Sequence, residues 1–292
     1  MIQAESVLNQ LKQAAPHLEF SLIKILTQGD HDKGIPLEIM PGQRMFVKEL
    51  EEALLNSRID IAVHSLKDMT TTLPQGLSLA AVTEQLDPRD VLVSRGKKLG
   101  ELAAGSTIGT GGLRRAAQLL AYRPDLKVIG IRGNVDTRLK KVTSGELDGI
   151  IIAAAAMIRL GEESKITEYL SLESFLPAVG QGALGIEIRD EDLEIAELVS
   201  AVNHKPTWQC VTAERAFLNA LGVGCRAPVG ALATVNDNAL TLQGMVTTMD
   251  GSKTISTTEE GDTLVPEQIG NRLAQRMVAM GALKLIAEAG VR

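Results

Sequence analysis

The sequence has few aromatic and few metal-binding side chains. Aromatic residues make up only 2% of the 292 residues, so aliphatic side chains must build the core. The two cysteines and four histidines lie far apart along the chain, without the spacing of a metal site. No Gly-Lys-Ser/Thr run occurs, and no Gly-x-Gly-x-x-Gly segment follows a predicted strand. These absences argue against a metal centre and against a bound nucleotide.

Long apolar runs and an excess of positive charge are absent as well. A net charge of −6 argues against a general nucleic-acid binder. No apolar run is long enough to cross a bilayer. The N-terminal segment "MIQAESVLNQLKQ" lacks the basic and apolar regions of a signal peptide. With so few cysteines, these features predict a cytoplasmic protein that has no membrane and no nucleic-acid partner.

Short aliphatic runs alternate with amphipathic ones over the first two-thirds of the chain. This alternation predicts an α/β fold with parallel sheets and helices on both faces. Strands are expected over 18–26, 59–65, 106–110, 126–133 and 149–156. Helices are expected over 46–58, 113–123 and 134–146.

The last third has a different pattern, typical of a small α+β module. Residues 239–258 predict two strands around an Asp250-Gly251 turn. A long helix is expected from about Pro266. Its apolar stripe consists of Ile269, Leu273, Met277 and Met280.

A first candidate site lies in "AVHSLKDM", residues 62–69, where an apolar strand runs directly into Ser65, Lys67 and Asp68. Ligands of open parallel sheets bind beyond the carboxyl ends of the strands, so Asp68 is expected to face a site. A loop aspartate that caps a turn is the alternative interpretation.

Arginines at strand-to-helix junctions form a second candidate site. In "GTGGLRRAAQLL" (109–120), two glycines precede a predicted helix whose free N–H groups and dipole would attract an anion. Arg114 and Arg115 follow, and "IRGNVDTRL" (131–139) repeats the pattern. One such arginine is usually a solvated surface charge, whereas several on one sheet indicate a ligand with several carboxylates or phosphates.

Two glycine-rich segments complete the candidates. "LGVGCRAPVG" (221–230) places Cys225 in a loop beside Arg226, which would favour the thiolate. The alternative is a small apolar side chain that fills the loop. Cys210, in an amphipathic helical pattern, is expected to be a core thiol. "LPAVGQGALGIEIRD" (176–190) is typical of a hinge or of a close backbone approach between domains.

Taken together, these motifs resemble those of the hydroxymethylbilane synthase, or porphobilinogen deaminase, family. The resemblance covers nearly the whole chain and rests on "FVKELEEALLNSRIDIAVHSLKDM", "DPRD", "LRRAAQL", "RPDL", "RGNVDTRL", "LPAVGQGALGIE", "VTAERAFLNAL" and "GVGCRAPVG". It implies three domains, of which the first two resemble the lobes of periplasmic solute-binding proteins and the third is a small α+β domain. Their expected limits are 1–83 with 183–200, 88–176, and 205–292.

The resemblance also implies a reaction and a cofactor. Enzymes of this family are transferases that join four porphobilinogen molecules head to tail, releasing ammonia and yielding hydroxymethylbilane for porphyrin and haem biosynthesis. A dipyrromethane cofactor, bound by a thioether, anchors the growing chain, and the match assigns that thioether to Cys225. A monomer with porphobilinogen as its substrate is expected.

The resemblance carries over the following roles. Asp68 is the expected catalytic carboxylate, because the reaction forms cationic intermediates that a fixed negative charge stabilises. The residues expected to bind the cofactor are Cys225, Ser65, Lys67, Gly111, Gly112, Arg114, Arg115, Arg132 and Gly133. Those expected to bind the substrate are Arg138, Arg159 and Gln181.

Three departures from the family pattern leave alternatives open. The strand and loop that usually precede the first helix have no counterpart here, which we interpret as a misplaced start or a truncation. Two usual lysines are replaced by Ile39 and Gln43, and two usual serines by Gly111 and Gly112. A catalytically impaired paralogue and a two-lobed protein that binds small anions are therefore the alternatives to an active enzyme.

Overall fold

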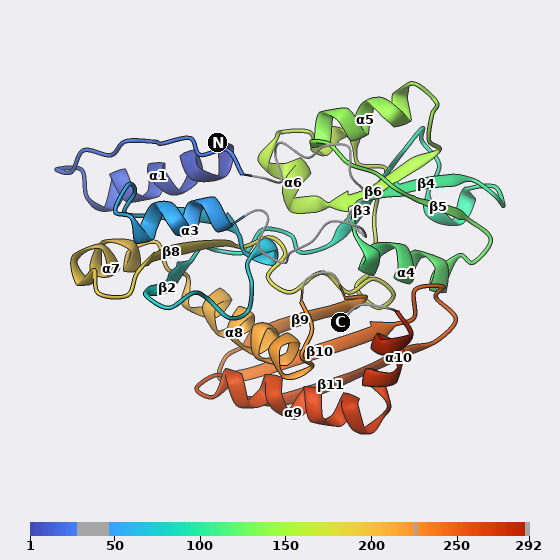
Figure 1. The fold of residues 1–292 in the computed structure, drawn as a ribbon. Helices are drawn as coiled ribbons and strands as arrows, with labels where there is room; N and C mark the ends of the chain where they lie inside the picture. Colours follow the sequence, from blue (N-terminus) through green and yellow to red (C-terminus); the bar gives the residue numbers. More distant parts are fainter. Residues whose placement is uncertain (28–46, 225–226, 290–292) are drawn as a thin grey trace.

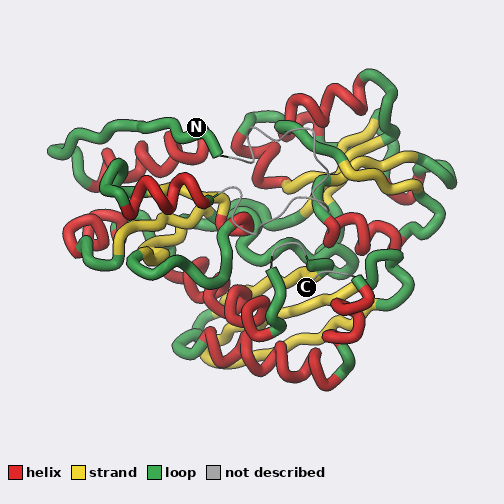
Figure 2. The backbone as a smooth tube through the Cα atoms, viewed as in Figure 1, coloured by secondary structure: helices red, strands yellow, loops and turns green. Residues whose placement is uncertain are grey.

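The computed structural model describes residues 1–27, 47–224 and 227–289. Three separate sheets, each with its own helices, divide the described residues into a first lobe, a second lobe and a C-terminal module (Figure 1). The tube in Figure 2 shows the strands of each sheet in yellow beside the red helices that pack on them. The mixed α/β architecture and the C-terminal α+β module agree with the sequence. The limits proposed for the three domains remain predictions.

The first lobe is built on a three-stranded sheet of order β1-β8-β2. Strand β8 lies in the middle and pairs antiparallel with both neighbours, so the parallel sheet expected here is wrong. The chain leaves the first lobe after β2 and returns to it from the second lobe through β8. Strand β8 therefore runs in the direction opposite to β2. The elements are β1 (Ala62–Ser65), β2 (Leu77–Val82), β8 (Leu184–Arg189), η1 (Leu66–Asp68), α1 (Ile2–Ala14), α3 (Lys48–Leu55) and α7 (Leu193–Ser200).

The second lobe holds a five-stranded sheet of order β5-β4-β6-β3-β7. Strand β4 runs parallel to β5 and β6, as expected, whereas β3 is antiparallel to β6 and β7. The strands are β3 (Asp90–Ser94), β4 (Thr107–Thr110), β5 (Lys127–Gly130), β6 (Gly149–Ala153) and β7 (Glu168–Tyr169). The helices are α4 (Leu113–Tyr122), α5 (Val135–Thr143), α6 (Ala154–Arg159), η2 (Leu99–Glu101) and η3 (Glu163–Lys165).

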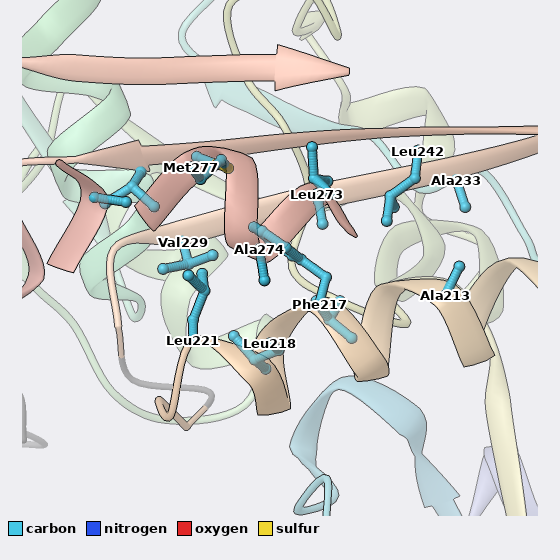
Figure 3. Close-up of a cluster of buried hydrophobic side chains, with 14 of the residues drawn as sticks. Ala213, Phe217, Leu218, Leu221, Val229, Ala233, Leu242, Leu273, Ala274 and Met277 are labelled. Atoms are coloured by element: carbon cyan, nitrogen blue, oxygen red, sulfur yellow. The ribbon is translucent and has the colours of Figure 1, made fainter. Parts of the chain in front are cut away.

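The C-terminal module packs helices against a three-stranded antiparallel sheet of order β11-β10-β9. Its core joins Phe217 to Leu273 and Met277, all fully buried (Figure 3). The predicted hairpin and helix are confirmed, but Met280 is 49% exposed and lies outside the apolar stripe. The elements are α8 (Lys205–Ala220), β9 (Val229–Asn236), β10 (Ala239–Thr247), β11 (Thr254–Asp262), α9 (Pro266–Ala279) and α10 (Ala282–Glu288).

The strand expected over 18–26 is wrong, because residues 19–27 form no regular structure. Only Phe20 packs against the core of the first lobe, while Leu22, Ile23 and Leu26 are exposed. An apolar run becomes a strand only where a neighbour satisfies its backbone groups, and none of the described strands pairs with this one.

Two crossover segments connect the lobes, the first between β2 and β3 (residues 83–89) and the second between β7 and β8 (residues 170–183), and their backbones are in contact. Leu86 donates its N–H to the carbonyl of Gly182 (3.2 Å). Gly182 has a φ of +97°, and a Cβ there would lie 2.4 Å from the oxygen of Leu86, so only glycine fits. The close approach predicted from the glycine-rich segment is therefore present.

The tip of the β10–β11 hairpin rests on the second lobe. Gly251 has a φ of +72°, and a Cβ at this position would lie 2.2 Å from the backbone nitrogen of Ala121, in the last turn of α4. The C-terminal module is thus seated against the end of that helix.

Candidate anion-binding site at the lobe junction

Asp68 ends the short helix η1, which directly follows strand β1. Its carboxylate is exposed and accepts no hydrogen bond from any residue that the structure describes. Burial lowers the pKa of the neighbouring Lys67 to about 8, and the positive charge of Arg115 adds to this effect, whereas Asp68 opposes it. Asp68 therefore lies beside the positive charges of Lys67 and Arg115, and no described residue donates a hydrogen bond to its carboxylate.

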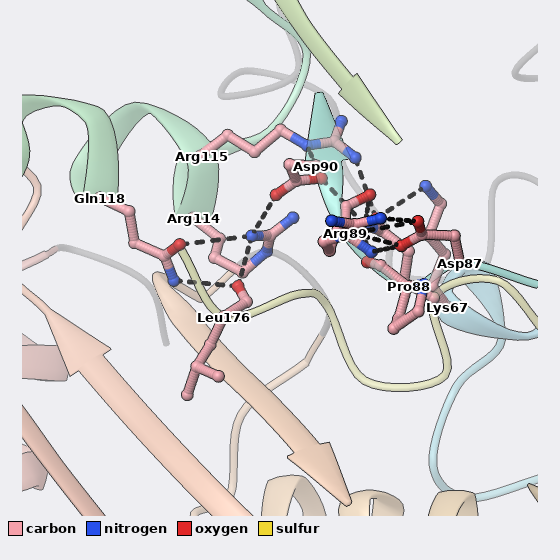
Figure 4. A network of polar contacts seen from close by, with 10 residues as sticks. Lys67, Asp87, Pro88, Arg89, Asp90, Arg114, Arg115, Gln118 and Leu176 are labelled. Carbon is pink, nitrogen blue, oxygen red and sulfur yellow. Dashed lines mark hydrogen bonds and ion pairs between the residues drawn. The ribbon is translucent and has the colours of Figure 1, made fainter. Parts of the chain in front are cut away.

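Arg114 and Arg115 are both buried and bind a carboxylate that the site prediction omitted (Figure 4). Arg114 Nη1 donates to Asp90 Oδ2 (2.7 Å), and Arg115 Nε donates to Asp90 Oδ1 (2.8 Å). Arg114 Nη1 also donates to the carbonyl of Leu176 (2.6 Å). Burial opposes ionisation of Asp90, but the two guanidinium charges outweigh it and hold the pKa of Asp90 well below its usual range.

Gln181, on the second crossover, joins these groups to the first lobe. Its amide oxygen accepts from Lys67 Nζ (3.2 Å) and from Arg115 Nη2 (2.9 Å). Its amide nitrogen donates to Asp90 Oδ1 (2.9 Å) and to the carbonyl of Pro88 (2.7 Å). Gln181 is buried and fully engaged within the protein, so the substrate contact expected of it remains a prediction.

Arg138 lies near the same group of cations. Burial lowers its pKa, as do the charges of Arg115 and Arg132, while Asp68 raises it. Its Nε donates to the carbonyl of Gly133 (2.9 Å). A Cβ on Gly111 would lie 3.0 Å from its Nη1, so the guanidinium occupies the space beside this glycine. The predicted Asp68, Lys67, Arg114, Arg115, Arg132 and Arg138 are thus close neighbours.

Two of the predicted residues bind protein atoms at the edge of this group. Ser65 accepts a hydrogen bond from Gln3 Nε2 (2.7 Å), which ties helix α1 to β1. Arg159 donates through Nη2 to the carbonyl of Gly182 (2.6 Å), and burial alone lowers its pKa. Their roles toward a ligand remain predictions.

The two helix N-termini proposed for anion binding differ. Helix α5 is capped by Asn134, whose side chain accepts the N–H of Thr137 (2.9 Å). Helix α4 starts after Gly112 without a side-chain cap, and a Cβ on Gly112 would meet no atom within 4 Å. The N–H groups at the start of α4 are therefore better placed than those of α5 to donate hydrogen bonds to an anion.

The two cysteines also differ. Cys225 lies outside the described residues, so the role assigned to it remains a prediction. Gly224, just before it, lines a small cavity together with Lys67 and Ala178. Cys210 is buried in the core of the C-terminal module, as predicted. Burial, and secondarily Glu214, raises the pKa of the Cys210 thiol to about 12.

Sequence reasoning missed two buried carboxylates, Asp90 and Glu214. Asp90 stands in the quoted "DPRD", directly before the apolar run "VLV", and a charge at the edge of such a run must be paired. Glu214 on α8 accepts the N–H of Gly180 (2.7 Å) and of Ala233 (2.8 Å), which joins a crossover to β9. The sequence therefore contained an indication that Asp90 is paired. It contained none for Glu214, because its partners are backbone N–H groups that no sequence motif identifies.

Glu214 makes stability depend on pH. Burial raises its pKa from 4.5 to about 7, despite the two backbone N–H donors. The folded state therefore keeps the Glu214 proton to a higher pH than the unfolded state does. The stabilisation that results from this protonation is fully present below pH 4.5 and is lost as the pH rises toward 7. We expect Glu214→Gln to remove about 3 kcal/mol of this pH dependence.

Urea unfolding at pH 5 and pH 8 measures the effect. Glu52→Gln is the control, because Glu52 is an exposed glutamate paired with Lys48. An unchanged difference between the two pH values in the Glu214 variant would contradict the expectation.

Gly111 and Gly112 provide a matched pair of substitutions. A serine at 112 meets open space and adds a hydroxyl at the uncapped start of α4, so we expect no loss of ligand affinity. A serine at 111 requires the guanidinium of Arg138 to move, so we expect KM to rise several-fold. Steady-state kinetics of the two variants checks the contrast, and equal KM values would contradict the proposed contact.

The described part of the chain holds no cluster of three or more His, Cys, Asp or Glu side chains suited to a metal ion. Among the described helices, none has both the length and the apolar character needed to cross a membrane.

The geometry defines a class of protein: an α/β protein that gathers lysine and arginine side chains at the junction of two lobes, beside one exposed carboxylate. The chain belongs to the porphobilinogen deaminase family. Residues 1–197 match the family model "Porphobilinogen deaminase, dipyromethane cofactor binding domain", and residues 208–279 match the C-terminal domain of the same family.

Curated relatives are similar over nearly the whole chain. The porphobilinogen deaminase of Alkaliphilus metalliredigens is 45% identical over 287 residues, which cover 98% of this chain and 91% of that protein. The porphobilinogen deaminase of Geobacter metallireducens is 45% identical over 286 residues, which cover 98% and 90%.

Solved structures show a more distant likeness. The VFT2 domain of Bordetella pertussis BvgS (double mutant) has a TM-score of 0.41 at 19% identity, covering 69% of this chain and 76% of that one. A putative methionine-binding lipoprotein from Bacillus subtilis has a TM-score of 0.43 at 14% identity, covering 70% and 87%.

Proposed function

We propose that this chain is a hydroxymethylbilane synthase, a transferase that joins porphobilinogen molecules head to tail with release of ammonia, for tetrapyrrole biosynthesis. The observation that carries the proposal is the free carboxylate of Asp68 beside the cations Lys67, Arg114, Arg115, Arg132 and Arg138. Family membership and the match to the cofactor-binding domain support it.

The cations fit a dipyrromethane cofactor and a pyrrole chain. Each pyrrole of porphobilinogen carries an acetate and a propionate, so every added ring brings two carboxylates. Around the buried Asp90 lie three cationic groups, Lys67, Arg114 and Arg115, so their charge exceeds that of the one carboxylate. A charge-assisted hydrogen bond contributes about 1.5–3 kcal/mol. The excess of positive charge therefore favours a ligand of this kind.

When bound through Cys225, dipyrromethane supplies the free α-carbon to which the first substrate is joined. Gly224, one residue before Cys225, lines a cavity with Lys67, and this placement supports the attachment site. The carboxylates of the cofactor would lie on Lys67, Arg114, Arg115 and Arg132, and on the free N–H groups at the start of α4.

Asp68 supplies the charge that the chemistry needs. Loss of ammonia from porphobilinogen leaves a cation, and an exposed carboxylate with no protein partner stabilises a positive charge without first breaking a hydrogen bond. The same oxygens can accept a proton from a pyrrole nitrogen and return it to the departing amine. Arg138 and Arg159 are proposed to bind the substrate, and a cytoplasmic monomer is the proposed form of the enzyme.

Incubation of the purified holoprotein with porphobilinogen tests the function. We expect one ammonia for each porphobilinogen consumed, and hydroxymethylbilane as the product identified by mass spectrometry. Binding of porphobilinogen without ammonia release would instead support an impaired paralogue or a protein that binds small anions.

A further inference from the structure

Two adjacent arginines converge on one carboxylate. Arg114 and Arg115 are consecutive residues of α4, and a helix turns by about 100° per residue, so their side chains leave the helix in different directions. Both guanidinium groups nevertheless reach Asp90, one at each oxygen (Figure 4). Asp90 therefore determines where the two positive charges meet.

The position of Asp90 is set by the sheet of the second lobe. It is the first residue of β3, pairs with Ala153 of β6, and accepts the N–H of Leu170 at its backbone carbonyl (2.9 Å). The residue is fully buried, and both side-chain oxygens are occupied by protein donors. A ligand could not reach this carboxylate, so any effect of Asp90 on the ligand must act through the arginines.

Asp90 also balances charge inside the junction. Arg114 and Arg115 repel each other, and burial together with this repulsion lowers the pKa of Arg114, whereas Asp90 raises it. One carboxylate between two guanidinium groups leaves a single excess positive charge on the pair. That excess is available for an anion on the ligand side.

We propose that Asp90 is a positioning residue for the reaction: from the buried side it holds the guanidinium groups of Arg114 and Arg115 together, so that both bind carboxylates of the pyrrole chain. The inference rests on the proposed function, because the ligand is taken from it.

The influence of Asp90 extends to the first lobe. The charged groups that face Lys67 are Arg115 and Arg114, which lower its pKa, and Asp68 and Asp90, which raise it. Removal of the Asp90 charge therefore lowers the pKa of Lys67 further below its value of about 8. Because this shift follows from the charge of Asp90 alone, the positioning role is tested by a substitution that keeps the charge and moves it.

The test compares three substitutions. Asp90→Asn keeps the shape and removes the charge, whereas Asp90→Glu keeps the charge and moves it by one methylene. Asp87→Asn is the matched control, since Asp87 belongs to the same segment but pairs, among the residues that the structure describes, only with Arg89. Three measurements are made on folded protein: the fraction that carries the cofactor by intact mass, the KM for porphobilinogen, and the pH dependence of Lys67 acetylation by peptide mass spectrometry.

For Asp90→Asn we expect loss of cofactor loading or a rise in KM of about 100-fold, and Lys67 acetylation at lower pH. For Asp90→Glu we expect a raised KM with the Lys67 profile near that of the wild type, and for Asp87→Asn neither change. Normal loading, KM and Lys67 titration in Asp90→Asn would overturn the proposal, as would failure of both Asp90 variants to fold while Asp87→Asn folds. The Lys67 titration does not require turnover, so an inactive wild type would count against the proposed function and leave this inference testable.

Discussion

Substitution of Asp68 by alanine is expected to lower turnover of porphobilinogen by about 1000-fold or more, because in the proposed mechanism this one carboxylate supplies both the electrostatic stabilisation and the proton transfer. The fold should persist, since the side chain is exposed and accepts no hydrogen bond from the described residues. The measurement is the rate of ammonia release, with thermal unfolding recorded in parallel.

Two comparisons make this result specific. Asp190→Ala removes another exposed carboxylate, at the end of β8, and should leave the rate unchanged. Asp68→Asn separates charge from shape and should be nearly as slow as the alanine variant. A near-normal rate in either Asp68 variant would exclude this residue from the chemistry.

The second large effect is expected at Cys225. Intact-mass spectrometry of the purified protein should show one dipyrromethane added to the polypeptide, and Cys225→Ser should lose both the added mass and all turnover. The reason is that a serine hydroxyl, unlike a thiolate, is a poor nucleophile at neutral pH.

Cys210→Ala is the matched control for the thiol. Its pKa of about 12 and its burial make Cys210 unreactive, so this variant should keep the added mass. An unmodified wild-type polypeptide after incubation with porphobilinogen would contradict the proposed attachment. Loss of the added mass in the Cys210 variant alone would show that the cofactor is attached to Cys210 instead of Cys225.

Local pattern was enough to predict most of the helices and strands of the second lobe and the C-terminal hairpin. Alternation of apolar and polar residues depends on neighbours in the chain, so it identifies elements such as α4 and β6. It does not show which strands pair, and therefore the first sheet was expected to be parallel, although β8 pairs antiparallel with both neighbours. The strand predicted over 18–26 is wrong for the same reason, because the apolar run does not show that a partner strand is missing.

The candidate site shows the same limit. The sequence indicated that the arginines gather near one ligand, but not what holds them. Gln181 was expected to bind substrate, yet its amide meets Lys67, Arg115 and Asp90 within the protein. Such a contact joins segments far apart in sequence, and the distance between them is set by tertiary packing.

The contact of Gly251 with α4 has a consequence for engineering of this protein. Hairpin tips are ordinarily tolerant places for a tag, an inserted peptide or new chain ends. Here the turn is pressed on the backbone of Ala121, at the opposite end of the helix from the arginine pair. An insertion at this tip would unseat the helix that presents the arginines, so this loop, although remote from Asp68 in sequence, is a poor place to modify the molecule.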